Sequence, residues 1–137
     1  MTARRSVPAE ASQLGVLHEF LQEFGAAAGL APARIQSLEL ALEEIFLNVV
    51  MHGSQPGTRP HVEVSLAVDA DTVTMTVEDD GPEFDPLSLP PPELHLSLEE
   101  RRVGGLGVFL VRQVMDSVDY ARVAGRNQLR MRKRHAP

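Results

Sequence analysis

The spacing of the hydrophobic residues changes once along this chain, and that change limits the folds it can adopt. Between residues 10 and 51, apolar side chains recur every three to four positions, which is the period of an amphipathic helix. Between residues 61 and 78 they alternate with polar or small residues, which is the period of a strand with one buried face. The pattern therefore predicts a layer of helices packed on a sheet.

Two helices are expected in the first part of the chain. The first spans residues 10 to 28 and stops at Gly29, and the second begins near Pro32, a residue suited to a first helical turn, and reaches about Met51. Their predicted core stripes are Leu14, Leu17, Leu21, Phe24 and Ala28 in the first helix, and Ile35, Leu38, Leu42, Ile45 and Val49 in the second.

The second part predicts a sheet built largely from hairpins. Its expected elements are strands at 61–68 and 72–78, a proline-rich loop at 80–92, a helix from about 104 to 115, and strands at 117–124 and 127–134 joined by a turn at Gly125-Arg126. Strands joined by hairpins favour antiparallel pairing. We therefore predict a single domain over residues 1–137, an α/β two-layer sandwich with a mostly antiparallel mixed sheet and three main helices on one face.

Composition narrows the function classes. The chain has 137 residues and a net charge of −6, so it is sized for one domain and is not the basic protein expected of a nucleic-acid binder. The absence of cysteine excludes disulfides and thiolate metal sites, and the five histidines show no paired ligand spacing. Residues 1–10 lack the apolar stretch of a secretory signal, so we expect a cytoplasmic protein without a membrane partner.

Glu44 and Asn48 form the first group of residues that indicates chemistry. They are four residues apart in the second predicted helix, so they lie on one helical face, pointing away from the core stripe. Most other members of that face are apolar, which indicates a semi-buried polar site, and hard oxygen ligands of this kind suit Mg²⁺. The alternative is an ordinary solvated face of an amphipathic helix.

Two further groups lie at turns. Asp79 ends a predicted strand, where its carboxylate can accept a hydrogen bond from an adenine amino group while Gly81 lets the backbone approach the base. Gly105 and Gly107 open the third helix, where free N–H groups and the helix dipole attract phosphate. Taken singly, the Asp79 group also fits an ordinary turn, and the Gly105 group also fits a flexible loop that ends at a helix. Neither a Walker sequence nor a dinucleotide-binding glycine pattern is present.

Together, in order and spacing, the three groups resemble the Bergerat family of ATP-binding domains, which includes histidine kinases, gyrase-type topoisomerases and heat-shock chaperones. Glu44-x-x-x-Asn48 resembles the N box of the family, Asp79-x-Gly81 its first glycine box, and Gly105-x-Gly107 its second. The resemblance covers about residues 10 to 134. It is greatest for the bacterial anti-sigma factor serine kinases, on the segments Asn48-x-x-x-His52-Gly53, Gly81-Pro82-x-Phe84-Asp85-Pro86, Gly104-Gly105-Leu106-Gly107-x-Phe109-Leu110-Val111 and Gly125-x-Asn127-x-Leu129-x-Met131-x-Lys133.

This resemblance implies ATP and Mg²⁺ as cofactors, with Asp79 reading the adenine and Glu44 acting as the general base. Desolvation, which raises the pKa of a carboxylate, would suit that second role. Residues 86 to 104 would form a lid over the nucleotide, with Arg101 or Arg102 touching phosphate. The implied nucleotide-binding set is Asn48, which would also hold the metal, Asp79, Gly81, Phe84, Gly104, Gly105, Leu106 and Gly107.

Three functions are compatible with these motifs. The first is a serine/threonine protein kinase that sequesters a partner, by resemblance a sigma factor, and phosphorylates a small anti-anti-sigma antagonist protein. The second is a nucleotide-dependent binding module without phosphotransfer. The third is a detached histidine-kinase catalytic domain, which is disfavoured because the chain has no room for a dimerising hairpin with an acceptor histidine. Glu44 favours the kinase, since a pure binder needs no base. A homodimer remains possible on the sequence, whereas direct nucleic-acid binding is not expected.

Arg130, Arg132 and Arg134 alternate along the last predicted strand and therefore share one face of the sheet. They are compatible with a charged edge or end of the sheet, which is the favoured interpretation. The alternative is a docking surface for an acidic partner.

Overall fold

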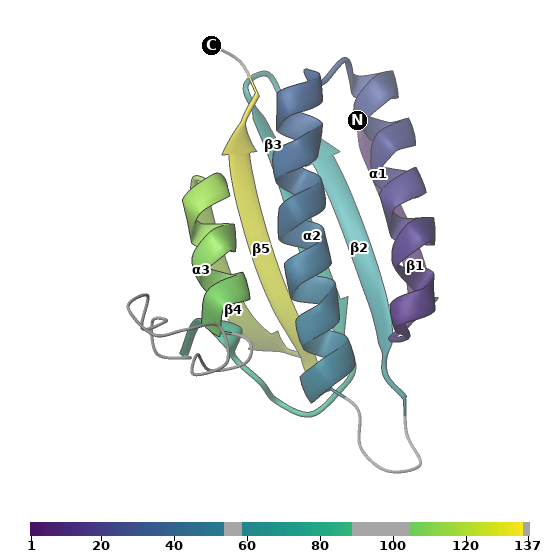
Figure 1. Ribbon diagram of the computed structural model, residues 1–137, viewed down its shortest axis with the longest axis vertical. Coiled ribbons are helices and arrows are strands. Elements are labelled where there is room, and N and C mark those ends of the chain that lie inside the picture. Colours follow the sequence, from purple (N-terminus) through teal and green to yellow (C-terminus); the bar gives the residue numbers. More distant parts are fainter. Residues whose placement is uncertain (54–58, 89–104, 136–137) are drawn as a thin grey trace.

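The computed structural model describes residues 1–53, 59–88 and 105–135 and shows three helices lying across one sheet (Figure 1). The sheet has five strands in the order β1-β2-β3-β5-β4, and each neighbouring pair is antiparallel. The predicted two-layer α/β sandwich is confirmed. The elements are β1 (Thr2–Pro8), α1 (Leu14–Ala28), α2 (Pro32–His52), β2 (His61–Val68), β3 (Thr72–Asp79), α3 (Gly105–Val114), β4 (Ser117–Val123) and β5 (Arg126–Arg134), with 3₁₀ turns η1 (Ala11–Gln13) and η2 (Pro86–Ser88).

The helix boundaries follow from their capping residues. Gly29 ends α1 in the left-handed conformation with φ of 71°, which a glycine adopts without steric cost. Pro32 occupies the first turn of α2, where its missing N–H is not needed. The predicted start of the first helix at residue 10 is early by four residues, because the chain first makes the η1 turn.

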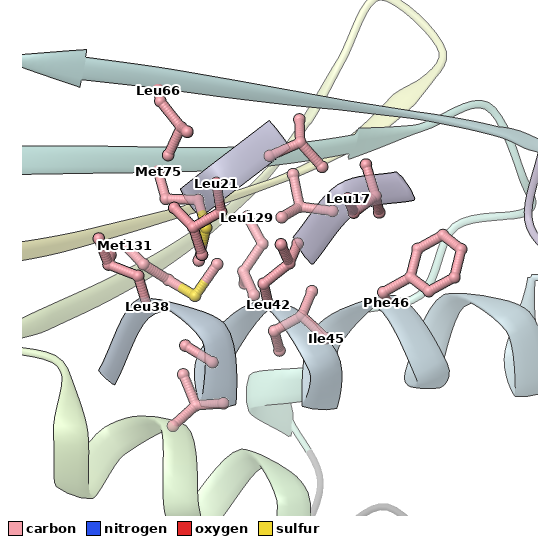
Figure 2. Packing of buried hydrophobic residues seen from close by; sticks show 14 of the residues in the cluster. Leu17, Leu21, Leu38, Leu42, Ile45, Phe46, Leu66, Met75, Leu129 and Met131 are labelled. Atoms are coloured by element: carbon pink, nitrogen blue, oxygen red, sulfur yellow. The ribbon is translucent and has the colours of Figure 1, made fainter. Parts of the chain in front are cut away.

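The core lies between the helices and the sheet (Figure 2). Leucines of α1 and the Leu38–Phe46 stretch of α2 pack on the inward side chains of β2, β3 and β5. The predicted stripe of α2 is buried as far as Ile45, while Val49 is only partly buried. The largest fully buried side chains are Phe46, Leu17, Leu21, Leu38, Leu42, Leu66, Met75, Met131, Val62, Val64, Val73 and Val111.

Strand β1 was not predicted from the sequence. Its seven residues contain two arginines and a single buried hydrophobic side chain, that of Val7, so no clear alternation marks it. The strand is defined instead by its antiparallel pairing with β2, from Thr2 opposite Ala67 to Pro8 opposite His61. Pairing with a neighbour of strong strand character can override a weak local preference.

Two details of the C-terminal hairpin correct the sequence interpretation. The turn between β4 and β5 is formed by Ala124 and Gly125, one residue earlier than predicted, and both have positive φ angles of 51° and 77°, as a two-residue hairpin of type I′ requires. Strand β5 lies between β3 and β4, so the part of the favoured interpretation that placed its arginines at an edge of the sheet is wrong. Of the three, Arg132 forms an ion pair with Asp119 at 3.3 Å.

The predicted lid falls mostly on residues 89–104, outside the described residues, together with Arg101, Arg102 and Gly104. Of that segment the structure describes only η2. Among the described residues, no helix is long and apolar enough to cross a membrane.

Candidate nucleotide-binding site

Asn48 lies in the last turns of α2 and is 6% exposed. Within the described part of the chain, its Nδ2 is buried without a hydrogen-bond partner. The residue lines a hollow between α2 and the ends of β3 and β5. The volume of this hollow is about 20 Å³, which has room for about one water molecule. The lining residues are Ile45, Asn48, Val49, Val77, Asp79, Phe84, Pro86, Tyr120, Asn127 and Leu129. A buried amide without a hydrogen-bond partner costs folding free energy, unless a ligand supplies that partner.

Asp79 is the second buried polar residue of this hollow, with 5% exposure. It ends β3 in the same inward phase as Val73, Met75 and Val77, so the strand carries its carboxylate to the rim of the core. Its Oδ1 accepts hydrogen bonds from the backbone N–H of Gly81 and from Nδ2 of Asn127, both at 3.0 Å. Burial raises the pKa of this carboxyl, and the two hydrogen bonds offset that effect only in part.

Asn127 is a site residue that sequence reasoning did not select. It pairs directly with Asp79 across the β3–β5 ladder and is 6% exposed. The sequence held an indication of its importance, because Asn127 occupies the inward phase of β5 that Leu129 and Met131 otherwise fill with apolar side chains. Most buried polar side chains form hydrogen bonds, so a polar residue at such a position indicates partners nearby.

The end of α2 and the turn after β3 approach each other closely at two glycines, Gly53 and Gly81. A Cβ at Gly81 would lie 3.0 Å from the carbonyl oxygen of Gly53 and 3.0 Å from Oδ1 of Asp79, so a larger residue would require these atoms to shift. Beside this contact, the rings of His52 and Phe84 stack with centroids 4.7 Å apart and planes 17° from parallel. These contacts connect the motif at the end of α2 with the turn that carries the first glycine box.

Glu44 lies one helical turn before Asn48, where α2 contacts α3. A Cβ at Gly107 would be only 2.5 Å from Oε2 of Glu44, so the carboxylate fills the space that a side chain at position 107 would need. Burial raises the pKa of Glu44, and the charge of Glu43 raises it further. The glycine at position 107 therefore has a packing reason in addition to the predicted phosphate role.

The structure thus brings most of the predicted site residues together. Asn48, Asp79 and Phe84 line one hollow, with Gly81 beside Asp79, and Glu44 lies on Gly107 at the start of α3. Gly105 begins α3, and Gly104 and the Leu106 side chain lie outside what the structure describes. No group of three or more histidine or acidic side chains in the described residues could hold a metal ion by itself. The roles of all these residues in binding and catalysis stay predictions.

Comparison with known proteins places this geometry in a family. Residues 7–133 match the family model of the histidine kinase-like ATPase domain, and the chain belongs to that family. Across its whole length the fold resembles one third of the chain in the crystal structure of the RsbU and RsbW domains of Rv1364c from Mycobacterium tuberculosis, with a TM-score of 0.69 and 16% identity. The histidine kinase domain of Erythrobacter litoralis EL346 gives a TM-score of 0.55 at 16% identity over 94% of this chain and 62% of its own.

Curated relatives narrow the class further. The chain is 31% identical over 101 residues to the serine/threonine-protein kinase BtrW of Bordetella bronchiseptica. These residues cover 74% of this chain and 71% of the relative. It is 27% identical over 116 residues to the serine-protein kinase RsbW of Bacillus subtilis, covering 82% of this chain and 72% of the relative. These relatives agree with the anti-sigma serine kinases that the motifs indicated.

Proposed function

We propose that this protein is an ATP-dependent serine/threonine protein kinase of the anti-sigma type, with its nucleotide site at the hollow between α2 and the sheet. The observation that carries the proposal is the meeting of Asn48 and Asp79, buried polar residues of α2 and β3, on one mainly apolar hollow. Relatives named serine or serine/threonine kinases, at 27–31% identity over most of their length, support the phosphotransfer.

The proposed binding mode follows from the chemistry of the side chains. Asp79 would accept a hydrogen bond from the adenine amino group, while the hollow, with room for about one water, would widen to admit the base. The phosphates would lie towards the start of α3, near Gly105 and Gly107, where backbone N–H groups are free of helical partners. Asn48 would supply an oxygen to Mg²⁺, which neutralises phosphate charge and usually keeps further water and phosphate ligands.

Glu44 would be the general base. Its carboxylate lies against Gly107 at the phosphate end of the proposed site, and burial makes it a stronger base than an exposed glutamate. It would take the proton of a serine or threonine hydroxyl as that oxygen attacks the γ-phosphorus of ATP, and ADP would leave. By family resemblance, the hydroxyl belongs to a small antagonist protein and the sequestered partner is a sigma factor.

Replacement of Glu44 by glutamine tests this proposal. Glutamine keeps the volume but cannot accept a proton at neutral pH, and a positioned base contributes about 10²–10⁴-fold to rate. We expect Glu44→Gln to bind ATP normally and to retain less than about one per cent of phosphotransfer to an antagonist protein, measured with radiolabelled ATP. Glu39→Gln is the matched control, because Glu39 lies on the same helix but contacts Gln22 of α1.

Equal labelling by Glu44→Gln and the wild type would remove Glu44 from the base role and leave the ATP site standing. A wild type that binds ATP, releases a bound partner on nucleotide exchange and labels no candidate antagonist would instead favour the binding module without phosphotransfer.

A further inference from the structure

We infer that Asn127 is a positioning residue that fixes the orientation of the side chain at position 79 and thereby the preference for adenine. This inference rests on the proposed ATP site. Asn127 is buried in β5 directly opposite Asp79, and its amide takes part in five hydrogen bonds. It lies between the carboxylate and the turn that follows β3, so it can control both.

The hydrogen bonds of Asn127 allow only one orientation of its amide. Its Oδ1 accepts from the backbone N–H of Phe84 at 3.1 Å, the hydroxyl of Tyr120 at 2.6 Å and Nη1 of Arg122 at 3.2 Å. Its Nδ2 donates to Oδ1 of Asp79 at 3.0 Å and to the carbonyl of Pro82 at 2.8 Å. A flipped amide would face two N–H donors with its own NH₂ and two acceptors with its oxygen, so the donor side is held against Asp79.

This fixed donor divides the two oxygens of Asp79 between different tasks. Oδ1 is occupied by Asn127 and by the N–H of Gly81. Oδ2 makes no hydrogen bond within the described residues, and it is not among their enclosed polar atoms that lack a partner. Oδ2 is therefore the accessible acceptor, and the contacts of Asn127 and Gly81 with Oδ1 fix the direction in which Oδ2 faces the hollow.

An adjacent pair of the same ladder provides a built-in control. Gln128 donates from Nε2 to Oε1 of Glu78 at 2.8 Å, the same amide-to-carboxylate contact one residue away. Successive side chains of a strand point to opposite faces of the sheet, so this pair lies on the face away from the hollow. Gln128→Glu disturbs an equivalent hydrogen bond without touching the proposed site.

The decisive experiment measures which nucleotide the full chain prefers when residue 79 carries one donor and one acceptor. Asp79→Asn, the double variant Asp79→Asn with Asn127→Asp, Gln128→Glu and the wild type are titrated by calorimetry with MgATP and with MgITP. ITP has an oxygen acceptor where ATP has the amino donor, so the ratio of the two dissociation constants reports which group of residue 79 faces the base.

In Asp79→Asn, the NH₂ of Asn127 should hold the oxygen of the amide introduced at position 79, so that the new NH₂ faces the base and favours ITP. We expect the preference to move towards ITP by at least about tenfold, the effect of one hydrogen bond. In the double variant, the carboxylate introduced at position 127 should attract that NH₂, turn the amide oxygen of residue 79 to the base and restore the preference for ATP. This charge-assisted bond should outweigh the neutral N–H of Gly81, which favours the opposite orientation.

A double variant that retains the ITP preference of Asp79→Asn would overturn the inference, because residue 127 would then not set the orientation. If the double variant does not fold in thermal unfolding, Asp79→Asn still provides a way to overturn the inference, since an unchanged ATP preference in that variant contradicts it. Gln128→Glu should keep the wild-type ratio, and a shift as large as that of Asp79→Asn would contradict the special position of Asn127. A folded wild type that binds neither nucleotide would instead contradict the proposed ATP site itself, and the inference that rests on it.

Discussion

The two ends of β3 carry aspartates with nearly the same hydrogen bonds and opposite electrostatics. Asp69, in the hairpin before the strand, accepts with Oδ1 from the N–H of Asp71 at 3.1 Å and of Thr72 at 2.9 Å. Asp79, at the other end, accepts with Oδ1 from Gly81 and Asn127. Backbone hydrogen bonds lower the pKa of the exposed Asp69, whereas burial raises the pKa of Asp79.

The difference separates an aspartate that stabilises a turn from one that we propose binds the nucleotide. At Asp69 the hydrogen bonds stabilise the charge, and the carboxylate fixes a tight turn. At Asp79 a similar set of donors does not compensate for the lost contact with water, so ionisation is less favourable than it is for an exposed aspartate. A buried carboxylate with an accessible oxygen in a hollow is the arrangement expected of a functional site.

The largest expected effect separates the two aspartates by nucleotide affinity. Asp79→Asn should weaken ATP binding about ten- to hundred-fold, because a charge-assisted hydrogen bond worth about 1.5–3 kcal/mol is lost and a donor faces the adenine amino group. Asp69→Asn, at the opposite end of β3, should bind ATP like the wild type. Calorimetry with MgATP checks both, and equal affinities in the two variants would end the assignment of Asp79 as the adenine reader.

The sequence predicted the elements whose burial follows a regular period. The helices α1 and α2 and the strands β2 and β3 carry continuous apolar stripes, so their existence and bounds could be predicted within a few residues. Strand β1 could not be predicted, because Val7 is its single buried hydrophobic residue and β2, with which it pairs, lies more than 50 residues away. The interior position of β5 was also missed, since no local pattern says which strand a hairpin places at the edge.

The candidate site was predictable to a similar extent. Glu44 and Asn48 follow from helical spacing and Asp79 from its turn, and the structure brings them to the same region. The proposed role of Asn127 depends on its register opposite Asp79 and on donors from Phe84 and the β4 strand. Those contacts arise only when distant segments pack, so only the out-of-phase polarity of Asn127 could have indicated them.

A smaller effect is expected on stability, with a sign that depends on pH. The folded-state pKa of Asp79 is raised, so its contribution to stability is greatest when it is protonated and falls as pH rises from the ordinary aspartate pKa through the raised value. An asparagine side chain at this position resembles the neutral form. Asp79→Asn should therefore gain unfolding free energy relative to the wild type as pH rises to neutrality, measured by denaturant unfolding across pH. A variant that loses stability over that range would show that the ionised carboxylate is favoured by the fold.

The smallest effect is expected at Asp69, with the opposite sign. Its folded-state pKa is lowered, so its contribution to stability is present above the ordinary aspartate pKa and is lost as pH falls through the lowered value. Asp69→Asn should be slightly less stable than the wild type at neutral pH and equal to it in acid, because asparagine keeps an oxygen for Asp71 and Thr72 but not the charge.

The Asp69 difference should be smaller than that of Asp79→Asn, since water competes for an exposed carboxylate in both the folded and the unfolded chain. The same denaturant series measures it, with Asp79→Asn in parallel. Two variants whose stability differences run in the same direction with pH would contradict the contrast between the ends of β3, because burial at Asp79 would then not outweigh its hydrogen bonds.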